Sequence, residues 1–137
     1  MYIHHATVRV LYADTDQMGY VYYGNYARYY EVGRVEAMRN LGLKYAELEE
    51  KHHIMMPVIS MESRFVRPAL YDELLTLETR ISKLPEQKII FRTDIYNEKK
   101  KLVNSGIVRL FFMDKLTGKR ISTPSIIVDK LKPYFEI

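Results

Sequence analysis

Two carboxylates, Asp14 and Asp16, stand in the stretch YADTDQMGYVYYGNYARYYEVGR, residues 12–34, where turn-forming residues lead into tyrosines and a helix-like pattern. The start of a helix presents unpaired backbone N–H groups and the positive end of the helix dipole. A carboxylate held beside such a start could share it with a carbonyl oxygen, which the N–H groups would polarise while the carboxylate attacks the carbon or activates a water. Acyl transfer requires this geometry. The alternative is that Asp-Thr-Asp forms only a structural turn or a helix cap.

The element that must supply this start is an amphipathic helix predicted over residues 23–41. Its apolar face consists of residues at helical spacing: Tyr26, Tyr30, Gly33, Ala37 and Leu41. Gly42 follows as a stop signal. A glycine inside a helix costs up to about 1 kcal/mol relative to alanine, and we expect Gly33 to let the helix approach a sheet closely.

The rest of the chain is predicted to be mainly extended. A strand over residues 5–12 precedes the helix, because apolar and polar residues largely alternate there. Short helices are expected over residues 45–51 and 124–131, the second with Thr123 as its cap. Four more strands, rich in β-branched and aromatic residues, are predicted over residues 55–66, 73–84, 88–97 and 102–114. Their connections are short enough for antiparallel neighbours.

One long helix and about five strands predict an α+β fold, with the helix on one face of an antiparallel sheet. The length of 137 residues suits a single domain, residues 1–137. A sheet with one helix leaves an edge or face open, so at least a dimer is expected.

Composition excludes several classes of site and partner. The chain has no cysteine, so a disulfide scaffold, a thiolate zinc site and a cysteine nucleophile are excluded. No run approaches the roughly 20 apolar residues of a membrane span, and no export signal opens the sequence, so we expect a cytoplasmic protein without a membrane partner. The formal charge is +4, but basic and acidic residues are interleaved, and no nucleic-acid partner is expected. The run of residues 99–101 is interpreted as a solvated hairpin tip.

Two stretches of the sequence carry a family resemblance. VRVLYADTDQMGYVYYGNYARYYE, residues 8–31, closely resembles the opening of the hydroxybenzoyl-CoA thioesterase-like branch of the hotdog-fold acyl-CoA thioesterases. That opening has an acid-x-acid, a nearby glycine and then Val-aromatic-(Tyr or His)-x-Asn-Tyr. FVRPALYDELLTLETRI, residues 65–81, resembles the second segment of the family, an Arg-Pro-Ala turn followed by an acidic pair and a strand. The resemblance implies a hotdog fold, in which the sheet wraps around the long helix, and hydrolysis of acyl-CoA to free acid and coenzyme A.

The resemblance also implies roles for individual residues. Asp16 takes the catalytic position as nucleophile or general base, and the backbone N–H of Tyr23, at the helix start, polarises the carbonyl. The family often has histidine where this chain has Tyr23, which puts a side-chain proton role there in doubt. Asp14 is expected to order the loop, and Asn25 to cap the helix or to contact the substrate.

The remainder of the substrate site is expected at the subunit interface of a homodimer or homotetramer. The expected acyl pocket, for which core packing is the alternative, draws on Tyr20, Tyr22, Met55, Met56, Val58 and Ile59. The candidates for contact with the phosphates of coenzyme A, for which a solvated charge is the alternative, are Arg64, Arg67, Lys88 and Arg92. No cofactor is expected, because coenzyme A is part of the substrate. No metal is expected either, because the four histidines form two adjacent pairs that would point to opposite faces of a strand.

Two alternatives remain open. The chain could be a hotdog domain that binds acyl-CoA without cleaving it, or a thioesterase whose substrate is carried by acyl carrier protein. The mildly positive charge permits the second alternative. A hotdog dehydratase is disfavoured, because its usual His and Glu pair has no matching positions.

Overall fold

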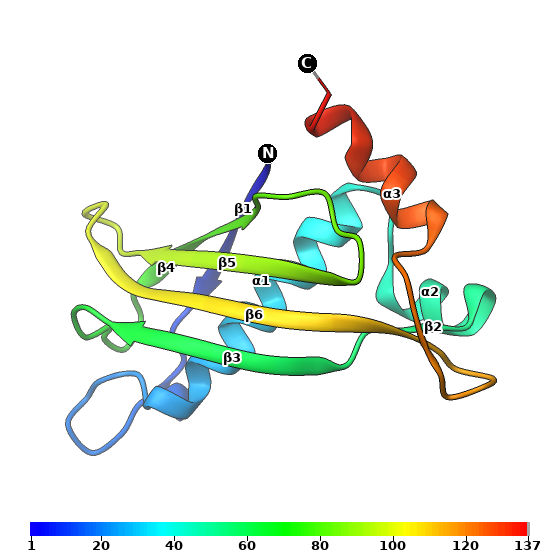
Figure 1. Cartoon of the computed structure of the whole chain (residues 1–137). Helices are drawn as coiled ribbons and strands as arrows, with labels where there is room; N and C mark the ends of the chain where they lie inside the picture. The colour runs from blue at the N-terminus through cyan, green and yellow to red at the C-terminus, as the bar shows by residue number, and fades with distance from the viewer. Residues whose placement is uncertain (137) are drawn as a thin grey trace.

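An antiparallel sheet wraps around one long helix in the computed structural model, which describes residues 1–136 (Figure 1). The five longer strands lie in the order β1 (Tyr2–Arg9), β4 (Leu74–Ile81), β5 (Lys88–Tyr96), β6 (Leu102–Asp114) and β3 (Val58–Phe65). Two-residue strands, β2 (Ile54–Met55) and β7 (Arg120–Ile121), pair with the far end of β6. Buried and half-buried residues alternate along β4, and the buried ones give the sheet an apolar face toward the helix. The predicted α+β class and hotdog architecture are confirmed.

Helix α1 (Tyr26–Asn40) lies on the apolar face of the sheet and packs against β1, β4 and β5. The predicted apolar face is buried, and Tyr29 and Met38 are buried with it. A Cβ atom at Gly33 would lie 2.6 Å from Thr79 Oγ1 of β4, so this glycine does permit the close approach that was predicted. Gly42 adopts a left-handed φ of 80° and ends the helix as expected.

The remaining helices are short. Helix α2 (Tyr45–His52) and helix α3 (Ser125–Leu131) lie close to the predicted ranges, although Pro124 rather than Thr123 occupies the cap position of α3. Three 3₁₀ turns, Tyr12–Asp14, Tyr23–Asn25 and Lys132–Tyr134, complete the helical structure of the described residues. None of these helices is long and apolar enough to cross a membrane.

Three expectations about the strands are wrong. The strand predicted over residues 55–66 is interrupted, because β2 ends at Met55 and β3 begins only at Val58. The first strand covers Tyr2–Arg9 rather than residues 5–12, because residues 12–14 leave the sheet in a 3₁₀ turn. The segment RPALYD, residues 67–72, was expected to connect two antiparallel neighbours, but the strands on either side of it do not pair with each other. Strand β3 pairs with β6, and β4 pairs with β1 and β5. By contrast, Lys99–Lys101 are exposed at the hairpin tip between β5 and β6, as predicted.

Strand β3 is an edge strand. It pairs only with β6, so the backbone groups along its other side have no strand beside them within residues 1–136. Its exposed apolar side chains, with Val66 just beyond it, are Val58, Ile59, Met61, Phe65 and Val66. A long, apolar and unprotected edge is where another strand adds to a sheet.

Candidate active site

Asp16 is held in a tight turn that fixes one of its two carboxylate oxygens. The Oδ1 atom accepts the backbone N–H groups of Met18 at 2.9 Å and Tyr20 at 3.2 Å. The turn closes through Asp16 N–H, which donates to the Tyr20 carbonyl at 2.8 Å, and Gly19 adopts a φ of 80° within it. The second oxygen, Oδ2, accepts no hydrogen bond from any described residue. The carboxylate is therefore oriented by one oxygen and free to react through the other.

The chain then reaches the start of the long helix, where backbone donors are free. The turn Tyr23–Asn25 leads directly into α1, and Asn25 N–H donates to the Tyr22 carbonyl at 2.9 Å. Within residues 1–136, the N–H groups of Tyr23 and Gly24 have no acceptor. They are the unpaired donors that a helix start presents, at the positive end of the dipole.

A cavity of about 330 Å³ brings the carboxylate and this helix start together. Its lining residues are Asp16, Met18, Tyr20, Val21, Tyr23, Tyr26, Phe65, Val66, Arg67 and Pro68. The rings of Tyr26 and Phe65 meet edge to face at 5.6 Å and form its apolar wall. Burial raises the pKa of Tyr26 to about 12, so its hydroxyl is neutral at pH 7.

Asp14 anchors the loop that carries Asp16. Its buried carboxylate pairs with Arg28 and accepts the Tyr29 hydroxyl and the Leu11 N–H, each at 2.9 Å. Its carbonyl accepts Tyr22 N–H at 2.9 Å and Asn25 Nδ2 at 2.8 Å. Burial alone would raise the pKa of Asp14, but the bonds from Leu11, Tyr29 and Arg28 hold it below its ordinary value. Asp14 thus stays charged and ties the end of β1 to the helix, in line with the ordering role expected for it.

Four of the predicted site residues meet in this cavity: Asp16, Tyr20, Tyr23 and Arg67. Two others lie beside it without lining it. Tyr22 is exposed and stacks on Tyr23, with ring centroids 4.5 Å apart. The prediction that the Asn25 side chain caps the helix is wrong, because that side chain bonds to the Asp14 carbonyl instead.

The other predicted site residues lie elsewhere on the protomer. Val58 is at the opposite end of β3 from the cavity, and Met56 lines a different cavity before that strand. Arg64 lines a hollow of about 350 Å³ together with Arg92. Phe65 lines the Asp16 cavity but was not among the residues predicted from the sequence. A signal for it was present, because Phe65 is the first residue of the second segment that resembles the family.

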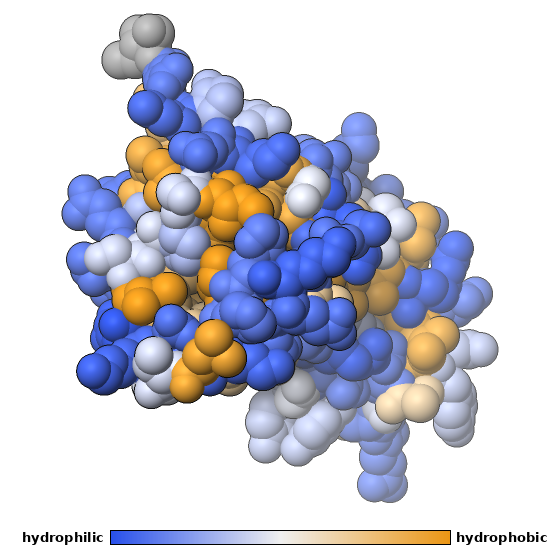
Figure 2. Space-filling view, turned by 90° about the vertical axis from the view of Figure 1, so that its right-hand side faces the viewer, coloured by the Kyte–Doolittle hydropathy of each residue, from blue (hydrophilic) through white to orange (hydrophobic). Residues whose placement is uncertain are grey.

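The cavity that Met56 lines has a volume of about 270 Å³ and lies between α2 and the start of β3. Its lining residues are Tyr45, Leu48, Glu49, Ile54, Met55, Met56 and Pro57, and we call it the α2–β2 cavity. The end of the molecule that carries α2 shows apolar patches between hydrophilic side chains (Figure 2).

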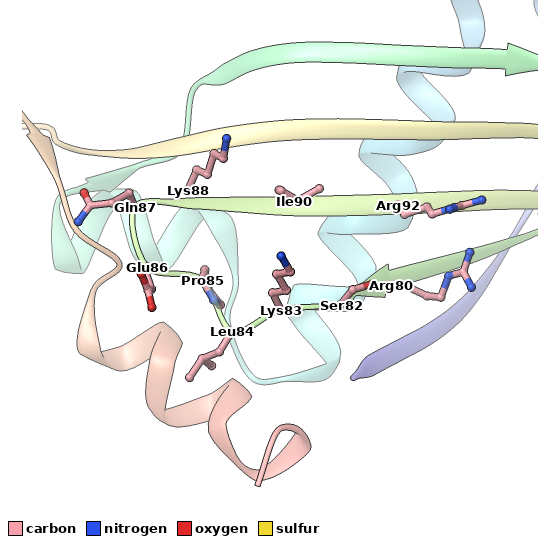
Figure 3. A pocket seen from close by; sticks show the side chains of 10 residues that line it. All are labelled: Arg80, Ser82, Lys83, Leu84, Pro85, Glu86, Gln87, Lys88, Ile90 and Arg92. Atoms are coloured by element: carbon pink, nitrogen blue, oxygen red, sulfur yellow. The ribbon is translucent and has the colours of Figure 1, made fainter.

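A hollow of about 580 Å³ lies at the turn between β4 and β5 and has a basic rim (Figure 3). Arg80 pairs with Asp94, and Arg92 Nε lies 3.5 Å from Asp94 Oδ1. Lys83 and Lys88 make no ion pair with any described residue. These two lysines are thus the cations of the rim that are available to an anionic ligand.

Known proteins share both sequence and fold with this chain. Residues 10–131 match the sequence model of the thioesterase-like superfamily. The acyl-CoA thioester hydrolase YbgC of Escherichia coli is 30% identical over 125 residues, 91% of this chain and 92% of that protein. The crystal structure of a DHNA-CoA thioesterase from Staphylococcus aureus is 29% identical, has a TM-score of 0.86 and covers 100% of this chain and 97% of its own. A mutant 4-hydroxybenzoyl CoA thioesterase, complexed with 4-hydroxybenzoyl CoA, shares the fold at 21% identity, with a TM-score of 0.86 and coverage of 95% and 99%.

Proposed function

Because the chain belongs to the thioesterase-like superfamily, we infer that it is a thioester hydrolase that cleaves acyl-CoA to a free acid and coenzyme A. The observation that carries the assignment is the shared cavity, which is lined both by Asp16, with its free carboxylate oxygen, and by Tyr23, with its unpaired backbone N–H. Those two features are what hydrolysis of a thioester needs, namely a reactive carboxylate and donors for the carbonyl oxygen.

The reaction follows from this geometry. The thioester carbonyl oxygen accepts the Tyr23 N–H, and the helix dipole stabilises the negative charge that develops on it. A donor of this kind is worth roughly 3 kcal/mol in the transition state. Asp16 either attacks the carbonyl carbon, giving an anhydride that water then hydrolyses, or takes a proton from a water that attacks in its place. In both routes the C–S bond breaks and coenzyme A leaves as the thiolate, which is then protonated.

The basic hollow supplies a site for the phosphates of coenzyme A. Lys83 and Lys88 carry the unpaired charges there, whereas Arg80 and Arg92 of the rim face Asp94. Lys83→Glu with Lys88→Glu should raise KM for acyl-CoA several-fold but leave KM unchanged for an acyl thioester of N-acetylcysteamine, which has no phosphate. Lys99→Glu, at the hairpin tip, is the matched control. The carrier-protein alternative also requires a basic docking surface, so the same variants should be tested with acyl carrier protein thioesters.

A homodimer is expected through the open edge of β3. Two copies of an edge strand can pair antiparallel about a two-fold axis, which hides the same surface on both. We place the axis at Ser63, because Glu62, which also pairs with Arg109 of its own chain, would then face the partner's Arg64, and the exposed Met61 would face the partner's Phe65. A further association of dimers to a homotetramer and a cytoplasmic location remain predictions, and a role in lipid metabolism is proposed with them.

The test is release of thiol from benzoyl-CoA and from short to long aliphatic acyl-CoAs. Asp16→Asn keeps the shape of the side chain and removes its charge, so kcat should fall at least about 100-fold while acyl-CoA binding and the fold are retained. Asp129→Asn, on the exposed surface of α3, is the control. Turnover by the Asp16→Asn variant at the wild-type rate would overturn the role of Asp16. A wild type that binds acyl-CoA and cleaves none would favour the non-catalytic alternative.

A further inference from the structure

The ring of Tyr22 lies against Gly24, in the 3₁₀ turn before helix α1, and against the ring of Tyr23. We propose that Tyr22 is a positioning residue for the thioester hydrolysis inferred above. Its ring, seated on Gly24, holds the Tyr23 ring as a wall of the cavity and keeps water away from the Tyr23 N–H. The proposal rests on that hydrolysis and adds to it a residue that does not itself line the cavity.

The glycine at position 24 makes room for this ring. A Cβ atom there would lie 2.8 Å from Cε2 and 3.2 Å from Cδ2 of Tyr22. Both distances are shorter than the separation of about 3.5–4.0 Å at which carbon atoms pack. The backbone conformation does not require a glycine here, because the glycines of residues 1–136 with a left-handed φ are Gly19, Gly42 and Gly118. Gly24 is therefore explained by the close approach of the Tyr22 ring.

The backbone of Tyr22 is fixed on both sides, which sets the direction in which its side chain leaves the chain. The Tyr22 N–H donates to the Asp14 carbonyl at 2.9 Å, and the Tyr22 carbonyl accepts the Asn25 N–H at 2.9 Å. Both bonds use main-chain atoms of Tyr22, so they survive an exchange of its side chain. A substitution at this position should therefore remove the ring and leave the loop and the helix start where they are.

The Tyr23 ring needs such support, because Tyr23 lines the cavity although the residue is 67% exposed. An exposed side chain exchanges between rotamers unless a neighbour fixes it, and the Tyr22 ring lies 4.5 Å away at an interplanar angle of 41°. Hydrogen bonding to the Tyr23 side chain raises the pKa of Tyr22 above its ordinary value, so Tyr22 brings no charge to the helix start at pH 7. A backbone donor shielded from water acts more strongly on the carbonyl oxygen than a hydrated one. Loss of the Tyr22 ring should therefore lower kcat.

The first test measures kcat and KM for the acyl-CoA that the wild type cleaves fastest. Tyr22→Ala should lower kcat about tenfold, as expected for the loss of one aromatic pair that holds the site. KM should change less than about threefold, because the Tyr22 ring does not line the cavity. Tyr22→Phe keeps the ring and should stay within about twofold of the wild type in both parameters. An unchanged kcat in Tyr22→Ala would overturn the proposal.

A double-mutant cycle then tests whether Gly24 acts through the ring. Gly24→Ala keeps the backbone N–H but displaces the Tyr22 ring, so kcat should again fall about tenfold. Tyr22→Ala and Gly24→Ala together should also cost about tenfold, because the second change finds no ring to displace. A loss of about a hundredfold in the double variant would mean that the two residues act independently, and the proposal would fail.

The second test follows the Tyr23 ring itself and does not depend on turnover. In NMR spectra of protein with labelled tyrosine, the ring resonances of Tyr23 are assigned with Tyr23→Phe. They should move in Tyr22→Ala and in Gly24→Ala, because the neighbouring ring no longer acts on them. Tyr12→Ala is the control for both tests, since it removes an exposed ring that meets Tyr71 edge to face at 5.7 Å and does not line the cavity. Unmoved Tyr23 resonances in Tyr22→Ala would overturn the proposal, whereas a wild type that cleaves no thioester would refute the proposed function.

Discussion

Asp14→Asn should destabilise the folded chain by roughly 2 kcal/mol at pH 7. Asp14 Oδ2 accepts Leu11 N–H and the Tyr29 hydroxyl, and Oδ1 faces the guanidinium of Arg28. Asparagine can keep the first two bonds with its single oxygen, but its NH₂ group then faces the cation. A hydrogen bond to a charged group contributes about 1.5–3 kcal/mol. The Arg28 side chain is 44% exposed and regains water in the variant, so the lower part of that range applies.

The loss should depend on pH in a defined direction. The fold holds the pKa of Asp14 below its ordinary value, because the bonds from Leu11, Tyr29 and Arg28 outweigh the effect of burial. In the unfolded chain that pKa is about 3.9. The stabilisation is therefore fully present above the unfolded value and is lost as the pH falls through the folded value. Wild type and variant should therefore begin to converge in stability as the pH falls below about 4 and should become equal only below the lowered pKa of the folded state.

Urea unfolding followed by circular dichroism, at neutral and at acidic pH, measures both quantities. Asp129→Asn lies on the exposed surface of α3 and should change the free energy of unfolding by less than about 0.5 kcal/mol. A loss in Asp14→Asn no larger than that of the control, or one that persists unchanged at about pH 3, would refute the reasoning.

Three further outcomes are expected. Gly33→Ala should cost about 1–3 kcal/mol in urea unfolding, because the new Cβ atom would lie 2.6 Å from Thr79 Oγ1; equal stability would contradict the close packing. In a single turnover in ¹⁸O-water with enzyme in excess, an anhydride that water opens at the Asp16 carbonyl carbon should leave the released acid unlabelled and put the label in Asp16, whereas label in the acid alone would exclude that route and is the outcome expected of a general base. Glu62→Arg should weaken the dimer about tenfold in sedimentation equilibrium, and adding Arg64→Glu should restore it; no effect from the first change would exclude the proposed pairing.

The sequence predicted the parts of the site that are close together in the chain. Asp16 and Tyr23 are separated by seven positions, so the family motif and one helix start were enough to expect them side by side. The buried face of α1 followed from periodicity, because side chains three and four apart share a face of a helix. The close approach of the helix to the sheet at Gly33 could be predicted for the same reason, because Gly33 lies on that face.

The sequence did not predict which residues that are distant in the chain lie together in the fold. Met56 and Val58 were grouped with Tyr20 in one pocket, but the direction of β3 carries them to its far end, and strand direction depends on which strands pair. The end of β1 was misplaced because alternation continues to Tyr12. The strand stops earlier, where the Asp14 carboxylate takes the Leu11 N–H that a sheet would otherwise use.

The anchor at Asp14 has one more consequence, for how the chain can change over generations. Among the described residues, the groups that bind the Asp14 carboxylate, those of Leu11, Arg28 and Tyr29, do not line the Asp16 cavity. Mutations that reshape the cavity can therefore accumulate without loosening the loop that aims the carboxylate. The side chain of Tyr23, which lines the cavity, can be replaced by such mutations. The backbone N–H at this position stays in place whatever side chain the residue carries. Rigidity and specificity are encoded by separate residues, so selection can act on one while the other is preserved.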